Sequence, residues 1–269
     1  MQAVQGKRFK IPIVGLGTWS VHDPARIVEQ AIRIGYRHID TAQMYGNEAE
    51  VGQGIRNSGK RAEVMVTTKV QPHMLAPHDL ERSVKESLAK LRTDVIDLLL
   101  IHWPNPRVPL SETLGAMSKM KREGYTRAIG VSNFNVALLE EANKVSPEPV
   151  VCNQIECHPF LNQDKVIASC RKHDIAVVAY SPIARGGAPG NETLERIGKA
   201  HGKTAAQVSL RYLVQQGIVV IPRTSKLERL EENFALFDFE LSKPEMQDIY
   251  KLAHRGGRIV DWTWSPKWD

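Results

Sequence analysis

The stretch His38 to Glu48, HIDTAQMYGNE, contains the unit from which the fold is built. A short apolar strand-like run ends at Asp40, a polar loop carries Tyr45, and a helix is expected to begin behind Asn47. Glu50 stands three residues after Asn47, which is the spacing of a reciprocal capping box. A carboxylate and a phenol are therefore expected at one end of one strand, as in a proton-transfer site.

The same strand-then-helix unit repeats along the 269 residues. Eight short apolar runs, beginning near residues 14, 37, 64, 95, 128, 150, 176 and 217, are each followed by a helical pattern. None of the runs alternates in polarity, which indicates a parallel sheet buried on both faces. Eight such units in this length predict an α/β fold, a closed (β/α)8 barrel of the TIM type.

Further segments are expected around the barrel. The opening 13 residues predict a β-hairpin that turns at Gly6-Lys7, and extra helices are expected behind Thr204 and Ser242. The chain ends in a C-terminal tail that carries the Trp-rich segment 262–269, expected over the active-site face and made mobile by Gly256-Gly257. No Pro/Ser-rich linker divides the chain, so residues 1–269 are predicted to form a single domain.

A doubly wound dinucleotide-binding fold is the competing prediction. The segment GLGTWS (15–20) begins like its glycine fingerprint but lacks the third glycine, and no helix starts directly behind it. The barrel is therefore favoured.

Composition excludes several classes of protein. The net charge of +6 is spread among acidic residues without an aromatic-basic motif, which argues against nucleic-acid binding. The longest apolar run, 95–101, is interrupted by Asp97 and no signal segment opens the chain, so no membrane association is expected. Three cysteines without metal-ligand spacing suit a reduced cytoplasmic protein with no metal site. The positive charge fits a phosphate-bearing cofactor and equally an ordinary basic surface.

Functional residues of a barrel lie where its strands end. Nearly every predicted strand closes with polar or aromatic side chains: Thr18-Trp19, Asp40, Lys69, His102-Trp103, Ser132-Asn133, Gln154, Tyr180-Ser181 and Arg223-Thr224. Each alone is explained by a solvated loop, but together on one rim they indicate a site.

Some of these residues fit an acid–base mechanism. Tyr45 is a candidate proton donor whose pKa of about 10 would be lowered by a nearby ammonium group. Lys69 can supply that ammonium, Asp40 can orient Lys69, and His102 can donate to a carbonyl oxygen. Structural alternatives are a solvated tyrosine, a structural ion pair and a core histidine. Lys69 also fits a Schiff-base lyase.

The sequence resembles the aldo-keto reductase family over nearly its whole length, most of all its compact bacterial members of the 2,5-diketo-D-gluconate reductase and methylglyoxal reductase type. The segments that carry the resemblance are GLGTW (15–19), IDTAQMYGNE (39–48), TK (68–69), DLLLIHWP (97–104), GVSNF (130–134), NQIE (153–156), IPRT (221–224) and RLEEN (229–233).

The resemblance implies NADPH-dependent reduction of small aldehydes, ketoaldehydes or keto sugar acids. It makes Asp40, Tyr45, Lys69 and His102 the catalytic tetrad, with Tyr45 as the general acid. It also implies NADPH contacts by four groups of residues. Ser132, Asn133, Gln154 and Tyr180 would bind the nicotinamide, and Thr18 and Trp19 are further expected cofactor contacts. Ser181 and Ile183 would meet the pyrophosphate. Arg223, Thr224 and Arg229 would hold the 2′-phosphate, and Glu232 and Asn233 the adenine; family members often have Lys and Ser where this chain has Arg223 and Thr224.

The substrate wall is expected to combine Trp19, His102 and Trp103 with Trp262 and Trp264 of the tail. The tail tryptophans are equally well explained by packing against the barrel. The expected partner is a small carbonyl compound, and the protein is expected to act as a monomer. An NADPH-binding barrel with a regulatory or structural role is the remaining alternative.

Overall fold

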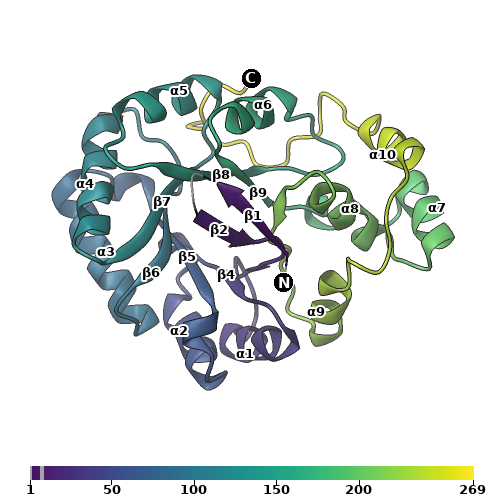
Figure 1. Ribbon diagram of the computed structural model, residues 1–269, viewed down its shortest axis with the longest axis horizontal. Helices are drawn as coiled ribbons and strands as arrows, with labels where there is room; N and C mark the ends of the chain where they lie inside the picture. The colour runs from purple at the N-terminus through teal and green to yellow at the C-terminus, as the bar shows by residue number, and fades with distance from the viewer. Residues whose placement is uncertain (1, 7–8) are drawn as a thin grey trace.

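The computed structural model describes residues 2–6 and 9–269, and within them eight parallel strands form the centre of the molecule (Figure 1). Each strand pairs with the one before it in the chain, in the order β3 to β10. The strands are β3 (Leu16–Gly17), β4 (His38–Asp40), β5 (Met65–Val70), β6 (Ile96–Ile101), β7 (Thr126–Ser132), β8 (Val150–Glu156), β9 (Ala176–Tyr180) and β10 (Val219–Val220).

The first and last strands are joined as well. Val14 forms a parallel bridge with Val220, and the amide of Gly15 donates to the carbonyl of Val220 at 2.9 Å. The amide of Gly17 then donates to the carbonyl of Pro222 at 3.0 Å. These bonds close the sheet on itself, so the predicted (β/α)8 barrel is confirmed.

Helices surround the strands (Figure 1). In the described part of the chain they are α1 (Pro24–Ile34), α2 (Glu48–Asn57), α3 (Pro77–Leu91), α4 (Leu110–Arg122), α5 (Val136–Val145), α6 (Asp164–Lys172), α7 (Glu192–His201), α8 (Ala205–Val214), α9 (Leu227–Phe234) and α10 (Lys243–Tyr250). The predicted capping box at Thr204 starts α8, and Ser242 caps α10. None of the helices in the described residues has the length and apolar character needed to cross a membrane.

The capping box predicted at Asn47 is not formed, although α2 begins at Glu48 as expected. In the described part of the chain, the side chain of Asn47 makes no capping hydrogen bond to α2. Its amide instead donates to the carbonyl of Thr18 at 2.8 Å and accepts from the hydroxyl of Thr41 at 3.1 Å. Asn47 therefore ties two strand ends together beside Asp40.

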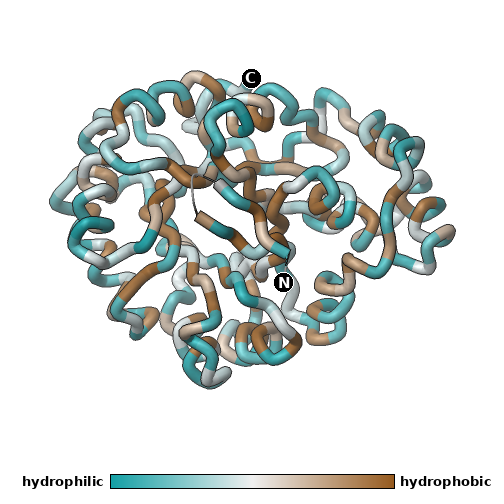
Figure 2. The backbone as a smooth tube through the Cα atoms, in the orientation of Figure 1, coloured by the Kyte–Doolittle hydropathy of each residue, from teal (hydrophilic) through white to brown (hydrophobic). Residues whose placement is uncertain are grey.

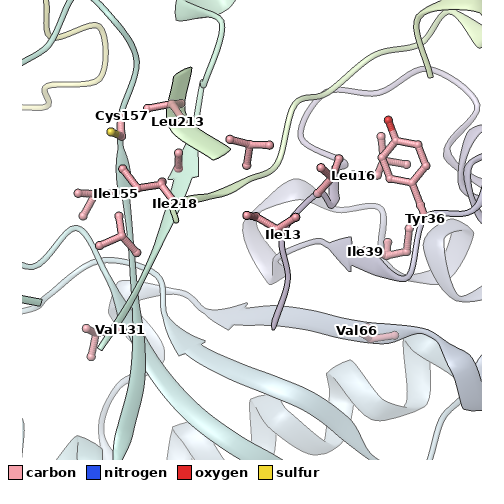
Figure 3. Close-up of a cluster of buried hydrophobic side chains, with 14 of the residues drawn as sticks. Ile13, Leu16, Tyr36, Ile39, Val66, Val131, Ile155, Cys157, Leu213 and Ile218 are labelled. Atoms are coloured by element: carbon pink, nitrogen blue, oxygen red, sulfur yellow. The ribbon is translucent and has the colours of Figure 1, made fainter. Parts of the chain in front are cut away.

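Apolar side chains fill the layer between strands and helices. Figure 2 shows the strands mostly brown and the helices alternating between brown and teal, as expected for helices with one buried face. Figure 3 shows part of this layer, in which Leu16 and Ile39 lie near Tyr36, and Val66 belongs to the next strand. The buried layer holds each strand in place and so fixes where each strand ends.

A second apolar cluster lies inside the barrel. The predicted hairpin is confirmed: β1 (Ala3–Gly6) and β2 (Phe9–Pro12) pair in antiparallel fashion and lie across the barrel in Figure 1. Ile11 of β2 packs with Met65 and Ala176, which begin β5 and β9. The hairpin therefore closes the end of the barrel where strands begin. The predicted turn at Gly6-Lys7 lies partly outside the described residues.

Candidate functional site

The opposite end of the barrel, where the strands end, holds a cavity of about 660 Å³. Most of the residues predicted for the site line it: Thr18, Trp19, Asp40, Tyr45, His102, Trp103, Ser132, Asn133, Gln154, Tyr180, Ser181, Ile183, Arg223, Thr224, Arg229, Trp262 and Trp264. The closed barrel brings these residues together from strands that are far apart in the chain.

Lys69 of β5 connects the predicted acid–base residues. Its ammonium Nζ lies 2.6 Å from Oδ1 of Asp40, donates to the carbonyl of Thr41 at 2.8 Å, and lies 3.2 Å from the hydroxyl of Tyr45. Lys69 is fully buried behind Asp40 and Tyr45. A buried charge is tolerated when it is paired and hydrogen-bonded, and Lys69 has three oxygen neighbours.

Asp40 is the second buried charge of the site. Its Oδ1 faces Lys69, and its Oδ2 accepts from the amide of Gln154 at 2.7 Å. Gln154 belongs to β8, on the far side of the barrel from β4, so this bond spans the interior. The position of the carboxylate is therefore set from two sides.

The direction of the Tyr45 pKa differs from the expectation. Burial is the largest influence and raises the pKa of Tyr45 above its ordinary value, although Lys69 acts to lower it. The predicted lowering of the Tyr45 pKa is therefore wrong. Burial would also lower the pKa of Lys69, but Asp40 and Tyr45 outweigh it, so that this pKa is raised. The resting site holds a neutral phenol beside an ammonium.

His102 faces the same space as a neutral imidazole. Burial, and secondarily the charge of Lys69, hold its pKa well below the usual value. Its ring lies edge-on to that of Tyr45, with 5.6 Å between the centroids. Its Nδ1 is buried and has no hydrogen-bond partner among the described residues. A neutral imidazole can donate one N–H to a ligand.

Ser132, Asn133 and Tyr180 form a hydrogen-bonded chain along the next part of the cavity. The amide of Asn133 donates to the carbonyl of His102 at 3.0 Å, and its Oδ1 accepts from the hydroxyl of Tyr180 at 2.8 Å. Asn133 adopts the left-handed backbone conformation, with φ of 63°. The hydroxyl of Ser132 donates to the carbonyl of Gln154 at 2.8 Å. These bonds hold the hydroxyl end of the Tyr180 ring in place.

Basic side chains gather at the other end of the cavity. The guanidinium groups of Arg223 and Arg185 each lie 4.9 Å from the ring centroid of Trp19. Arg229 and Lys226 line the same region. The pKa of Arg223 is lowered by partial burial and by the like charge of Arg185. This end of the cavity is therefore suited to an anion.

The sequence prediction missed Arg185, Lys226, Met44 and Val260, which also line the cavity. Arg185 stands two residues beyond Ile183 in a loop where Ser181, Ala184 and Arg185 all have φ near +50°. The sequence signal available for Arg185 was its basic charge in the loop that follows the Tyr180-Ser181 strand end. Two predicted residues, Glu232 and Asn233, lie away from the described cavity lining: Glu232 accepts from the hydroxyl of Thr204 at 2.7 Å, and Asn233 is buried.

The C-terminal tail, residues 251–269, reaches the cavity as predicted. Trp264 packs edge-on against Trp103 with 5.1 Å between centroids, and the ring of Trp262 lies parallel to that of Trp264 at 6.3 Å. The mobility expected from Gly256-Gly257 does not follow from the structure. A Cβ on Gly257 would lie 1.8 Å from the carbonyl oxygen of Phe160, so glycine here permits close contact between two backbones.

The fold and the site together define the class of protein: a (β/α)8 barrel with a buried Lys69–Asp40 ion pair beside Tyr45 at the rim of an aromatic cavity. Within the described residues, no cluster of three or more His, Cys, Asp or Glu side chains is arranged to hold a metal ion.

Comparison with known proteins gives the family. Residues 13–254 match the model of the Aldo/keto reductase family. The chain is 41% identical over 265 residues to methylglyoxal reductase DkgB of Escherichia coli O157:H7, covering 96% of this chain and 99% of that protein. It is 40% identical over 247 residues to glyoxal reductase of Bacillus subtilis (strain 168), covering 90% and 89%. A crystal structure of a putative 2,5-diketo-D-gluconic acid reductase B superposes with a TM-score of 0.98 at 46% identity, covering 100% and 98%. The chain belongs to the aldo/keto reductase family and is an oxidoreductase that acts on carbonyl groups.

Proposed function

We propose that the protein reduces small aldehydes, ketoaldehydes or keto sugar acids to alcohols with NADPH, using Tyr45 as the general acid. The observation that carries the proposal is the contact of the buried Lys69 with both Asp40 and the hydroxyl of Tyr45, at the rim of an aromatic cavity. Similarity to a methylglyoxal reductase and a glyoxal reductase supports small carbonyl substrates.

Proton transfer follows from the positions of Tyr45 and His102. A substrate carbonyl in the cavity accepts hydrogen bonds from the Tyr45 hydroxyl and from an imidazole N–H. As the carbonyl carbon gains a hydride, its oxygen becomes an alkoxide and takes the Tyr45 proton. The raised pKa keeps that proton in place beforehand, and Lys69 stabilises the phenolate afterwards. General acids of this kind contribute about 10²–10⁴-fold to a rate.

The donor set of the cavity fits a nicotinamide cofactor, which family members use. When bound, NADPH supplies the hydride. The fixed ring of Tyr180, with Ser132, Asn133 and Gln154, suits the nicotinamide end. Arg223, Thr224 and Arg229 suit the 2′-phosphate, because guanidinium groups bind phosphate in bidentate fashion. The repulsion between Arg223 and Arg185 would be relieved by a bound phosphate, which favours NADPH over NADH.

The geometry argues against Lys69 as a Schiff-base nucleophile. Such an amine must be unprotonated and must face its substrate. Lys69 is buried behind Asp40 and Tyr45, and its pKa is raised, which keeps it as an ammonium. Its contacts suit stabilisation of a phenolate instead.

The substitution Tyr45→Phe tests the proposal. It removes one hydroxyl and leaves the ring, so we expect carbonyl-dependent oxidation of NADPH to fall by about 10²–10⁴-fold. Binding of NADPH, measured by quenching of intrinsic fluorescence, should remain. The wild-type protein should bind NADPH more tightly than NADH in the same assay. Near-normal turnover in the variant would remove Tyr45 from the mechanism, and equal affinities would mean that the 2′-phosphate is not recognised.

A further inference from the structure

Glu156 is a buried carboxylate that the proposed reaction does not use. It ends β8, is 1% exposed, and lies two residues beyond Gln154 on the same strand. Side chains two residues apart in a strand point to the same face, and Gln154 points inward to Asp40. Glu156 therefore lies one layer above the catalytic group, toward the cavity mouth, and is paired in register with Tyr180 of β9.

The oxygen atoms of Glu156 hold the backbone of the C-terminal tail. Oε1 accepts from the amide of Ile259 at 2.6 Å, and Oε2 accepts from the amide of Val260 at 2.8 Å. Nε2 of His158 lies 3.0 Å from Oε1. A carboxylate removed from water is costly unless such bonds satisfy it, so the tail and Glu156 hold each other in place.

The tail is held at two further points. Gly257 lies against the backbone of Phe160, where there is no room for a side chain. At its far end, the carboxylate of Asp269 accepts from the amide of Val136 at 2.9 Å, at the start of α5. Figure 1 shows the C-terminus beside α5. The segment between these points is therefore a fixed loop.

The fixed segment forms part of the cavity wall. Val260, whose amide donates a hydrogen bond to Glu156, lines the cavity together with Trp262 and Trp264. The two tryptophans are about half exposed, at 54% and 47%, so part of each ring is available to a ligand. Tyr45 and His102 line the same cavity from the barrel side. A substrate whose carbonyl meets Tyr45 would place its remaining group toward these rings.

We propose that Glu156 is a positioning residue that sets the tail as the outer substrate wall, and that this wall favours carbonyl compounds with an apolar or ring-shaped group beyond the carbonyl. This inference rests on the proposed function for its substrate readout. Its structural part, the attachment of the tail, does not depend on that function.

Glu156→Gln is the direct test, because glutamine offers one acceptor where two amides need one each. Hydrogen exchange measured by mass spectrometry should show loss of protection at the amides of Ile259 and Val260. The matched substrates are phenylglyoxal and methylglyoxal, which differ only in the group beyond the ketoaldehyde. A misplaced wall should lower kcat/KM for phenylglyoxal by about 10–100-fold, through KM more than kcat, and leave methylglyoxal within about threefold. The Kd for NADPH should not change.

Two further variants complete the test. Gly257→Ala displaces the tail without altering Glu156 and should reproduce both effects, which keeps the test decisive if Glu156→Gln fails to fold. Glu148→Gln removes a carboxylate before the start of β8 that pairs with Lys121 at the surface, and it should change neither measurement. Unchanged protection in Glu156→Gln overturns the proposal, as does lost protection with an unchanged ratio between the two substrates. If the wild-type protein reduces neither compound, the proposed reduction of ketoaldehydes fails, and the exchange measurement still decides whether Glu156 holds the tail.

Discussion

The two ends of the barrel differ in what they bury. At the end where strands begin, Ile11 of the hairpin packs with apolar side chains from several strands. At the end where strands finish, Lys69, Asp40 and Glu156 are each 1% exposed or less. Burial of apolar surface stabilises a fold, whereas buried charges at best offset their own desolvation. The barrel therefore separates the source of its stability from the site of its chemistry.

Positive φ values, which non-glycine residues rarely adopt, occur at both ends of the barrel. Asn133, Ser181, Ala184 and Arg185 lie at or just beyond strand ends of the rim, whereas Arg92 and Asp174 lie in the turns that precede β6 and β9. Each such residue costs of order 1–3 kcal/mol and persists because the surrounding structure imposes it. The rim thus depends on the rest of the barrel, and the contrast can be tested by substitutions at each end.

Lys69→Met should have the largest effect. The substitution leaves the carboxylate of Asp40 buried without its cation, and breaking a buried pair in this way costs about 3–5 kcal/mol. Urea unfolding followed by tryptophan fluorescence should show this loss, and carbonyl reduction should be lost with it.

The control is Tyr45→Phe, which removes a hydroxyl from the same site but keeps the ion pair. It should lose activity with a much smaller change in the free energy of unfolding. If Lys69→Met were as stable as the wild type, the buried charges of the rim would not be the costly feature described above.

The arrangement of strands and helices was predictable from the sequence because local signals agreed with one another. Asp23, Pro24 and Gly35 mark α1 by cap chemistry, and the structure places all three at its ends. The gathering of Asp40, Lys69 and His102 at one rim was also predictable, since strand ends of a closed barrel meet, and their roles in proton transfer stay a prediction.

Features that depend on tertiary contacts were not predictable. Asn47 stands where a helix cap is expected, but its side-chain amide forms hydrogen bonds with Thr18 and Thr41 at two neighbouring strand ends instead. The pKa of Tyr45 moves opposite to the expectation because burial, which a sequence does not state, outweighs Lys69. Gly257 predicted a mobile tail, but it lies against the backbone of Phe160. That contact was not predictable because Phe160 is 97 residues away in the sequence.

Ile11→Ala tests the other end of the barrel. Ile11 is fully buried, and truncation of a buried isoleucine to alanine costs about 2–5 kcal/mol. We expect the free energy of unfolding to fall by that amount, while kcat and KM at a temperature where the variant stays folded match the wild type. A loss of activity in the folded variant would show that the hairpin end and the rim are coupled.

His38→Gln has the smallest expected effect. His38 is a buried titratable group at the start of β4, so it is an exception to the apolar character of that end of the barrel. Burial lowers the pKa of His38 to about 4. An unfolded chain, with a histidine pKa near 6.5, therefore binds the proton more readily at mildly acidic pH. The contribution to stability is complete above about pH 6.5 and is lost as the pH falls toward 4. As the pH falls from about 7.5 to 5, the wild-type free energy of unfolding, measured with urea, should fall by about 2 kcal/mol because of His38. The free energy of unfolding of the variant should lack this part of the decrease. The difference between the two proteins isolates His38, because the other buried histidine with a lowered pKa, His102, titrates in both. Equal slopes would mean that His38 takes up its proton as readily in the folded protein as in the unfolded chain, and that this end of the barrel is less apolar than its packing indicates.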